Sequence, residues 1–297
     1  MISSSAQVGD VGFWGPHVAG ILERHGLPDA APVAGFNPTY PTFLCGDVVV
    51  KLFGGSPNWC EAHSAERAAL DRLSTEPEIL TPGLLGWGSL SGESWPYLIS
   101  GLVPGVAWHH AGLSAPERLS AAAELGGQVR RVHALPPPDG LPRPDLRGLD
   151  LTAALVRSSL SPHLVAQADD FVEGIGIGVP VFVHADLVAA HAFVRDGRLT
   201  GVIDWGDAVA ADPYLELAQI HRDTFDCDKA LLRAFLDAYN WPDDAGFPRR
   251  ALAFALFRQA HGLTQHHSID VFVPVAARFP LQDIATLDDL ATELFGV

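Results

Sequence analysis

Lysine, cysteine and positive charge are all scarce in this chain of 297 residues. Only three cysteines occur, Cys45, Cys60 and Cys227, and their odd number and wide spacing exclude a disulfide framework and favour a reducing compartment. The chain has 19 basic against 35 acidic residues, and its formal net charge is −16. That charge argues against nucleic acids and anionic membranes as partners, because basic surface supplies most of the affinity for both.

Long apolar runs and targeting signals are also missing. No uninterrupted apolar run reaches the roughly 18 residues of a membrane span. The first ten residues, MISSSAQVGD, lack the basic and apolar regions of a signal peptide. With 48% hydrophobic residues the chain can bury a substantial core, in one large or two modest domains. We therefore expect a cytoplasmic globular protein.

The usual zinc motifs are absent although the chain has 13 histidines. No H-E-x-x-H occurs, and the cysteines lack C-x-x-C spacing, so a structural or hydrolytic zinc site has little support. A histidine-based metal hydrolase stays open as one alternative function.

The most informative stretch is residues 181–208, VFVHADLVAAHAFVRDGRLTGVIDWGDA. It predicts two short strands, at 192–194 and 199–203, joined at the Asp196-Gly197 turn. Such a hairpin returns Asp204 towards Asp186, which brings two carboxylates to one end of the sheet. Phosphoryl transfer needs one acid to orient a hydroxyl nucleophile and another to hold the metal that neutralises the phosphates. An H-x-D motif followed by a hairpin and an Asp is the arrangement found in kinases.

A lysine on a strand strengthens this interpretation. The chain contains only two lysines against 17 arginines, and one of them, Lys51, lies in the β-branched run 48–53. Because arginine is the default cation here, a strand lysine indicates a need for a compact charge. A lysine on an edge strand that pairs only with solvent is the alternative. The helical run 61–73 follows and contains two glutamates, Glu66 and Glu61.

These motifs resemble those of the aminoglycoside phosphotransferase family of protein-kinase-like small-molecule kinases, from about Gly35 to about Ala218. The family's H-G-D and D-F or D-W motifs correspond to the triplet that ends at Asp186 and to Asp204-Trp205. The resemblance looks closest to the kinases that modify hygromycin-type antibiotics. It implies an α+β, two-lobed, protein-kinase-like fold. The expected domains are a small β-rich N-lobe with an N-terminal helix (1–102) and a larger, mainly helical C-lobe (103–297).

The resemblance also implies the roles of individual residues. Asp186 would be the catalytic base, and Asp204 would be the principal ligand of Mg²⁺. The family's Asn is replaced by His191, a second candidate ligand whose imidazole suits softer ions such as Mn²⁺ better. The strand lysine of the family pairs with a helix glutamate, which would be Glu66 here, with Glu61 as the rival. The residues expected to contact ATP or GTP are Lys51, Glu66, Gly35, Asn37, Thr39, Ser100 and Leu102.

The sequence predicts mostly helices in the second half of the chain. An N-cap at Ser114 begins a helix that runs to about His133, and further helices are expected over 150–174, 213–222, 228–240, 248–266 and 283–295. Glu216, in a D-P-x-x-E-L-A element similar to that of the family, is expected to bond the backbone near the catalytic loop. Four acids are candidates for an acceptor site, with solvated helix ends and N-caps as the alternative: Asp207, Asp223, Asp226 and Asp228.

The function implied is transfer of the γ-phosphate of ATP or GTP to a hydroxyl of a sugar-bearing antibiotic, of aminoglycoside or nucleoside type, which would give resistance. A metabolic kinase of a choline-like or sugar substrate and a nucleotide-binding pseudokinase are the alternatives. The expected partners are the antibiotic and the nucleotide, without nucleic acid or membrane. The sequence does not specify the antibiotic, its hydroxyl, the nucleotide base or the oligomeric state.

Overall fold

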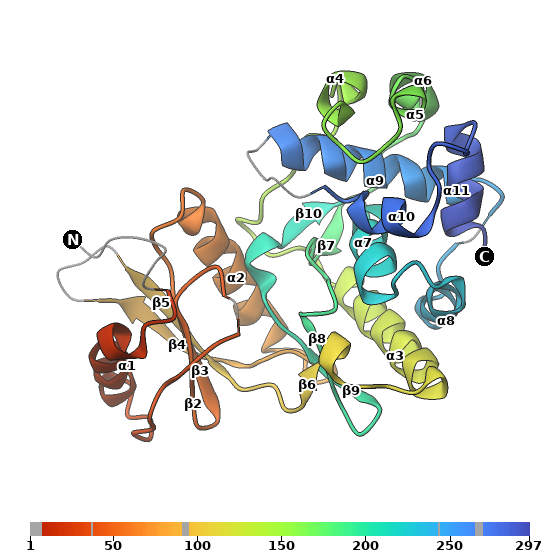
Figure 1. Cartoon of the computed structure of the whole chain (residues 1–297). Coiled ribbons are helices and arrows are strands. Elements are labelled where there is room, and N and C mark those ends of the chain that lie inside the picture. Colours follow the sequence, from red (N-terminus) through yellow and green to blue (C-terminus); the bar gives the residue numbers. More distant parts are fainter. Residues whose placement is uncertain (1–7, 37, 91–94, 243, 265–269) are drawn as a thin grey trace. The chain divides into compact units, whose positions relative to one another are not determined.

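The computed structural model describes residues 8–36, 38–90, 95–242, 244–264 and 270–297 (Figure 1). Its contacts divide the chain into two units. The first, here called the sheet unit, contains the described residues up to Pro104 together with 138–142 and 201–208. The second, the helical unit, contains 105–137, 143–200 and the described residues from Val209 onward. No helix among the described residues is long and apolar enough to cross a membrane.

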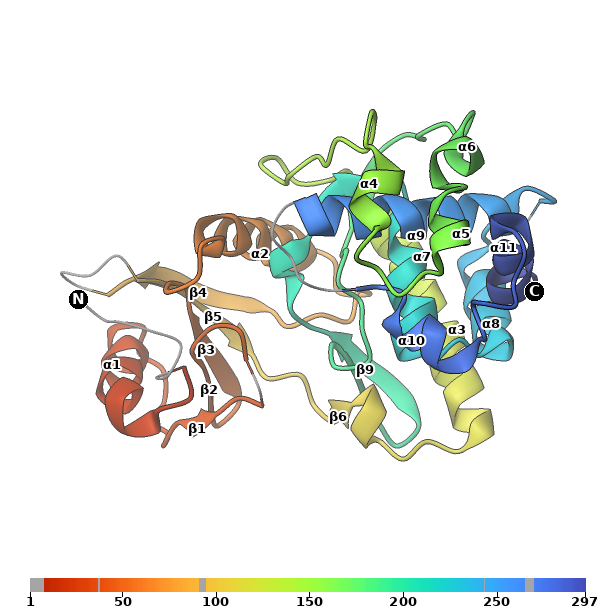
Figure 2. The same cartoon turned by 45° about the horizontal axis from the view of Figure 1, so that its top comes forward.

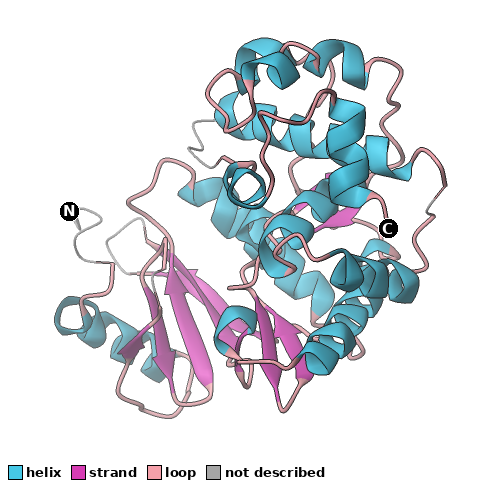
Figure 3. Ribbon diagram, turned by 45° about the vertical axis from the view of Figure 1, so that its right-hand side comes forward, coloured by secondary structure: helices cyan, strands magenta, loops and turns pink. Residues whose placement is uncertain are grey.

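The sheet unit is built on five antiparallel strands, drawn in magenta in Figure 3. Their order is β1-β2-β3-β5-β4. The elements of this unit are α1 (Val11–Arg24), β1 (Val33–Ala34), β2 (Thr42–Cys45), β3 (Val48–Leu52), α2 (Trp59–Leu73), β4 (Leu84–Ser89), β5 (Pro96–Gly101) and a 3₁₀ turn, η3 (Trp205–Asp207). Strands that follow one another in the sequence are joined by short connections, except that α2 lies between β3 and β4.

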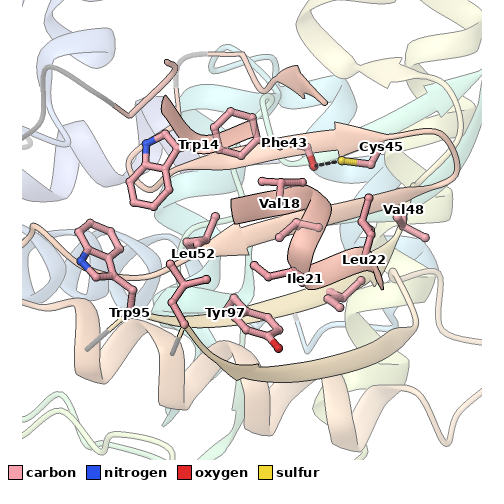
Figure 4. Packing of buried hydrophobic residues seen from close by; sticks show 13 residues of the cluster. Trp14, Val18, Ile21, Leu22, Phe43, Cys45, Val48, Leu52, Trp95 and Tyr97 are labelled. Carbon is pink, nitrogen blue, oxygen red and sulfur yellow. Dashed lines mark hydrogen bonds between the residues drawn. The ribbon is translucent and has the colours of Figure 1, made fainter. Parts of the chain in front are cut away.

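The two faces of this sheet bury different sets of side chains, because successive residues of a strand point to opposite sides. On β3, Val48, Val50 and Leu52 are buried with the apolar side of α1 (Figure 4). A smaller cluster contains Phe53 and Leu98, with Ala62 of α2 packed against it. Lys51, between Val50 and Leu52, therefore points to the face that α2 covers.

The helical unit contains mostly helices, with two short sheets. Its helices are α3 (Ala115–His133), α4 (Leu151–Leu155), α5 (Pro162–Val165), α6 (Ala168–Val172), α7 (Tyr214–Gln219), α8 (Lys229–Tyr239), α9 (Phe247–Thr264), α10 (Val273–Arg278) and α11 (Leu287–Phe295), with a 3₁₀ turn, η2 (Trp108–His110), and a π-helical turn, η4 (Ile220–Thr224). The strands are β6 (Val106–Ala107), β7 (Val181–Val183), β8 (Ala192–Arg195), β9 (Arg198–Val202) and β10 (Val209–Ala211). The predicted α+β class is confirmed.

Helix α9 is the core of the helical unit and packs against α4, α7 and α11 (Figure 2). It is buried on almost every side, since its central residues from Ala251 to Phe257 are all inaccessible or nearly so. Helices α3 and α8 form a second close pair. Their contact requires Gly126, where a Cβ atom would lie 2.2 Å from the carbonyl oxygen of Phe235.

Local sequence signals placed several elements correctly. Helix α3 begins with a capping box, in which the backbone N–H of Ser114 donates to Glu117 at 2.8 Å. The predicted hairpin forms between β8 and β9, and its turn residues Asp196 and Gly197 have φ angles of 52° and 73°. Positive φ at both positions is what a tight hairpin turn of matching twist requires.

The single helix predicted over 150–174 is wrong. The segment instead forms α4, α5 and α6, three helices of four or five residues. Ser161 is extended, with φ −63° and ψ 142°, and Pro162 then occupies the first turn of α5. Proline cannot continue a preceding helix but is favoured at the start of a new one, which explains the break.

Candidate active site

The first group of candidate residues lies within the sheet unit and centres on Lys51. Its Nζ atom lies 2.6 Å from Oε2 of Glu66 on α2 and 2.8 Å from Oδ1 of Asp204. The Lys51 and Glu66 side chains are only 14% and 9% exposed, whereas that of Asp204 is 41% exposed. The lysine is therefore held between two carboxylates, one buried and one open to solvent.

Charge explains why a lysine can be buried here. Burial alone would lower the pKa of Lys51, but the charges of Asp204 and Glu66 and their hydrogen bonds raise it well above its ordinary value. The ammonium also lies 5.6 Å from the ring centre of Tyr40 and 5.2 Å from that of Phe53, within the range of cation–π attraction. The cluster thus keeps Lys51 charged and restricts its direction.

Asp204 reaches Lys51 because the segment after β9 packs on α2. Trp205 is 2% exposed and donates its indole N–H to the Val202 carbonyl at 3.1 Å. At Gly206, a Cβ atom would lie 3.5 Å from Oε2 of Glu66, so η3 is in close contact with α2. Asp204 itself has φ 65° and ψ 64°, a left-handed conformation that Asp adopts more readily than most residues.

The other nucleotide-binding candidates occupy varied positions in the sheet unit. The Gly35 N–H donates to the Thr42 carbonyl at 2.8 Å, and Thr39 is exposed. Ser100 pairs with Val49 across the sheet. Asn37 lies outside the described residues.

Leu102 is exposed, and its N–H donates to the Asp47 carbonyl at 2.8 Å. This amide is therefore already used within the sheet unit, and contact of Leu102 with a nucleotide base would depend on its carbonyl group.

The second group lies within the helical unit, in the loop that follows β7. His184 is 2% exposed, and its Nδ1 accepts a hydrogen bond from the Asp186 N–H at 3.2 Å. The Oδ1 atom of Asp186 accepts a hydrogen bond from Nε2 of Gln219 at 2.8 Å, and Nη2 of Arg258 lies 3.8 Å from the same oxygen. His191, at the end of the loop, donates from Nδ1 to the Asp186 carbonyl at 2.7 Å.

Glu216 on α7 fixes the backbone of this loop. Its Oε2 accepts from the His184 N–H at 2.8 Å and its Oε1 from the Ala185 N–H at 3.2 Å. Burial raises the pKa of Glu216, but His133, His184 and the backbone donors together bring it below its ordinary value. The prediction that this acid bonds the backbone near the catalytic loop is confirmed.

Three of the four acids expected in an acceptor site make contacts within the helical unit. Asp223 accepts from the Ala189 N–H at 2.8 Å, Asp226 pairs with Arg278 at 2.7 Å, and Asp228 is the N-cap of α8. The acceptor role of these three acids stays a prediction. Asp207 is exposed on η3, and its acceptor role remains a prediction.

The donors available for a divalent cation are a carboxylate in the sheet unit and an imidazole in the helical unit. A carboxylate accepts at both oxygens, so Asp204 can ligate a cation while it is paired with Lys51. The hydrogen bond at Nδ1 of His191 places the lone pair of the neutral ring on Nε2, the tautomer that histidine ligands use. The described part of the chain holds no group of three or more His, Cys, Asp or Glu residues that could bind a metal. Magnesium suits a single carboxylate such as Asp204, since it retains water and phosphate ligands.

Gln219 and Arg258 were not foreseen from the sequence, although one signal pointed to Gln219. It lies three residues after Glu216, and residues at that spacing share one face of a helix. Once Glu216 is assigned to the catalytic loop, Gln219 is expected to face the same loop. Arg258 has no comparable signal, because α9 is far from the loop in sequence.

The chain is similar to a known protein family and to several solved structures. The model of the phosphotransferase enzyme family, APH, matches residues 40–253. Among solved structures, the GDP and kanamycin complex of APH(2″)-IIIa matches with a TM-score of 0.69 and 18% identity, over 94% of this chain and 99% of that one. The macrolide 2′-phosphotransferase MphH from Brachybacterium faecium matches with a TM-score of 0.59 and 20% identity, over 94% and 97%.

A third solved structure, the ADP and spectinomycin complex of APH(9)-Ia, matches with a TM-score of 0.61 and 13% identity, over 94% of this chain and 93% of that one. At these identities the neighbours establish the fold, and the kinase-like fold predicted from the H-A-D and D-W motifs is confirmed. The family model spans well over half of the chain. This protein therefore belongs to the phosphotransferase enzyme family.

Proposed function

We propose that this phosphotransferase moves the γ-phosphoryl group of ATP or GTP to a hydroxyl of a sugar-bearing antibiotic and thereby gives resistance to it. The observation that carries the proposal is the pairing of Lys51 with both Glu66 and Asp204. A strand lysine bonded to a helix glutamate is the arrangement that active kinases use to hold nucleotide phosphates. A protein that had lost catalysis would have no need to keep all three charges together.

Each residue has a separate task in the proposed reaction. Lys51 would hold the α- and β-phosphates, and Glu66 would fix the direction of its ammonium group. Asp204, with His191 as the second candidate ligand, would hold the Mg²⁺ or Mn²⁺ that neutralises the phosphates. Asp186 would accept a hydrogen bond from the acceptor hydroxyl and orient it towards the γ-phosphorus. It would take the hydroxyl proton as the new P–O bond forms and the bond from the γ-phosphorus to the β–γ bridging oxygen breaks, which releases ADP or GDP.

The antibiotic acceptor is supported by the neighbours. Their structures include complexes with kanamycin, streptomycin and spectinomycin, and one neighbour is a macrolide kinase. The net charge of −16 favours a cationic acceptor such as an aminoglycoside. Both ATP and GTP are candidate phosphate donors, since the neighbours were solved with GDP, ADP and ATP. We place the enzyme in the cytoplasm, where these nucleotides are present.

A panel assay tests the proposal. The purified protein is incubated with Mg²⁺ and either ATP or GTP, together with aminoglycoside, macrolide and nucleoside antibiotics. Mass spectrometry then detects the addition of one phosphate. We expect at least one antibiotic to be phosphorylated by the wild type and left unmodified by Asp186→Asn. Transfer only to choline-like compounds or simple sugars would support the metabolic-kinase alternative, and nucleotide binding without any transfer would support the pseudokinase.

A further inference from the structure

Gln219 is an unusual residue to find buried beside the proposed base. Its side chain is 1% exposed, so both ends of its amide must be hydrogen-bonded for burial to be tolerated. Nε2 donates to Oδ1 of Asp186 at 2.8 Å, and Oε1 accepts from Nε of Arg222 at 2.5 Å. The amide therefore links a half-buried arginine to the carboxylate.

Arg222 determines which way the amide of Gln219 points. A guanidinium group can only donate hydrogen bonds, so the end of the amide that faces Arg222 must be the oxygen. The NH₂ end then has to face Asp186, where it meets an acceptor. The donor group of Arg222 and the acceptor group of Asp186 thus determine the orientation of the amide, and the flipped amide would place donor against donor and acceptor against acceptor.

The two oxygens of Asp186 consequently differ. Oδ1 accepts from Gln219 and lies 3.8 Å from Arg258. Oδ2 lies 3.6 Å from Nδ1 of His191, too far for a hydrogen bond, and that N–H is already donated to the Asp186 carbonyl. Within the described part of the chain, only Oδ1 of this carboxylate has a hydrogen-bond donor, which leaves Oδ2 to meet the acceptor hydroxyl.

The turn that follows Gln219 and carries Arg222 makes two more contacts with the same loop. Helix α7 ends at Gln219 and continues as the π-helical turn η4. Asp223 of this turn accepts from the Ala189 N–H at 2.8 Å, and Thr224 donates to the Leu187 carbonyl at 3.3 Å. Single π-helical turns are often found at functional sites, and this one, together with Gln219 directly before it, supports the catalytic loop at three points.

We propose that Gln219, oriented by Arg222, is a positioning residue that fixes Oδ1 of Asp186 and presents Oδ2 to the acceptor hydroxyl. This rests on the proposed function, because it gives a role to one oxygen of the proposed base. Neither residue touches the substrate. Their effect is exerted on the direction of the carboxylate, and small errors in that direction reduce the rate of a positioned reaction strongly.

Kinetics of two pairs of variants test the proposal. Gln219→Leu removes the donor, and Gln219→Glu keeps the size but cannot donate when ionised. We expect both to lower kcat by about 10- to 100-fold while the KM for the nucleotide changes less than about 2-fold, because only the orientation of the base is lost. Arg222→Met should lower kcat by about 10-fold, and Arg222→Lys, which can still donate to Oε1, should recover most of it.

Gln167 provides a matched control. Its amide, like that of Gln219, is hydrogen-bonded at both ends, but its three partners are backbone groups of the helical unit outside the catalytic loop. Gln167→Leu should lower the melting temperature and leave kcat unchanged. If Gln219→Leu behaves like Gln167→Leu while Asp186→Asn abolishes transfer, the positioning role is overturned and the proposed function stands.

A readout independent of transfer covers the case in which no acceptor is phosphorylated. The side-chain amide of Gln219 should give a shifted and slowly exchanging NMR resonance in the wild type, because it donates to a carboxylate and is shielded from solvent. The resonance should move in Asp186→Ala and in Arg222→Met and stay in place in Gln167→Leu. A resonance that responds to neither substitution would overturn the link between Arg222, Gln219 and Asp186.

Discussion

The two groups of functional residues are held by opposite means. In the sheet unit, Lys51 is fixed by two ionised partners, Glu66 and Asp204. In the helical unit, Asp186 is fixed by a neutral amide, and its nearest cation, Arg258, lies 3.8 Å away. A cation that binds phosphates has to stay charged, and paired carboxylates ensure this. A base has to keep one oxygen available, so neutral donors on the opposite side serve it better than an ion pair.

The backbones of the two groups can be compared in the same way. Asp204 in the sheet unit and Ala185 in the helical unit both have φ 65°. Asp tolerates this left-handed conformation, because its short polar side chain can bond locally, whereas Ala pays a steric cost of about 1–2 kcal/mol. The helical unit offsets this cost through Glu216, which accepts from the N–H groups of both His184 and Ala185. The left-handed conformation of this loop is thus stabilised by the buried acid Glu216, and not by a residue type that favours this conformation.

The largest expected effect is that of Asp186→Asn, which tests the helical group alone. The substitution keeps the size of the side chain and an oxygen that can accept from Gln219, but it removes the base. We expect kcat to fall by about 10²- to 10⁴-fold, the usual contribution of a positioned base. Nucleotide affinity, measured by calorimetry, should change little, since Lys51, the residue proposed to bind the phosphates, lies in the other group. The exposed Asp283 provides the control, and Asp283→Asn should change neither quantity.

Retention of more than about a tenth of the wild-type kcat in Asp186→Asn would contradict the role of a base, for which the loss is about 10²-fold or more. The helical group would then lack a base, because no other acid described in the catalytic loop could replace Asp186.

The second effect concerns the ion-paired group. Lys51→Met leaves Glu66, whose side chain is 9% exposed, without its cation. Breaking a buried pair in this way costs about 3–5 kcal/mol, so we expect lower stability to denaturant together with a raised nucleotide KM. The chain offers one other lysine as a control. The half-buried Lys229 donates to the Thr292 carbonyl and pairs with no acid among the described residues, so Lys229→Met should leave stability and KM nearly unchanged at neutral pH.

A companion variant identifies the cause of this loss. In Lys51→Met/Glu66→Gln the buried charge is removed along with its partner, so about half or more of the lost stability should return, whereas the nucleotide KM should stay high. If the double variant is as unstable as the single one, the loss comes from packing of the lysine stem and not from charge.

The sequence predicted the ion-paired group more completely than the hydrogen-bonded one. Lys51 could be singled out from a scarce residue type and a β-branched strand, and the resemblance to the family implied Glu66 as its partner, with Glu61 as the rival. Gln219 carries no charge and belongs to no motif, and its position depends on a π-helical turn that has no clear sequence pattern. Asp223 and Asp228 were considered for a substrate site because an acid that caps a helix or loop has the same sequence as one that binds a ligand. Contacts of this kind become visible only once the chain is folded.

The third effect is a dependence of stability on pH that arises in the helical unit. Burial lowers the pKa of His221 to about 4, with the Leu294 carbonyl acting in the opposite direction. The unfolded chain binds a proton at this residue below about pH 6.5, whereas the folded chain does so only near pH 4. Stability should therefore fall by about 3 kcal/mol as the pH drops through this window, since each pKa unit corresponds to about 1.4 kcal/mol.

Denaturant unfolding between pH 7 and pH 4 measures this effect, and His221→Gln is the comparison. Glutamine can still donate to the Leu294 carbonyl but does not titrate, so the stability of the variant should be flatter over pH 6.5–4. Glu216, whose pKa is lowered, contributes in a separate window, because its stabilisation is lost only as the pH falls below about 4.3. Equal slopes for wild type and variant would show that His221 does not carry the dependence.

The smallest expected effect is at Ala185, where the helical loop has the alanine and the family motif has glycine. Ala185→Gly removes the steric cost of the left-handed conformation, about 1–2 kcal/mol. It also adds about 0.5–1 kcal/mol of chain entropy to the unfolded state and removes a buried methyl group worth about 0.8 kcal/mol. The terms nearly cancel, so we expect a change below about 1 kcal/mol in unfolding free energy and an unchanged kcat. Ala185→Val, whose branched side chain fits this conformation poorly, should instead be clearly destabilising. A loss of more than about 2 kcal/mol in Ala185→Gly would mean that the methyl group, and not the bonds to Glu216, holds the loop in place.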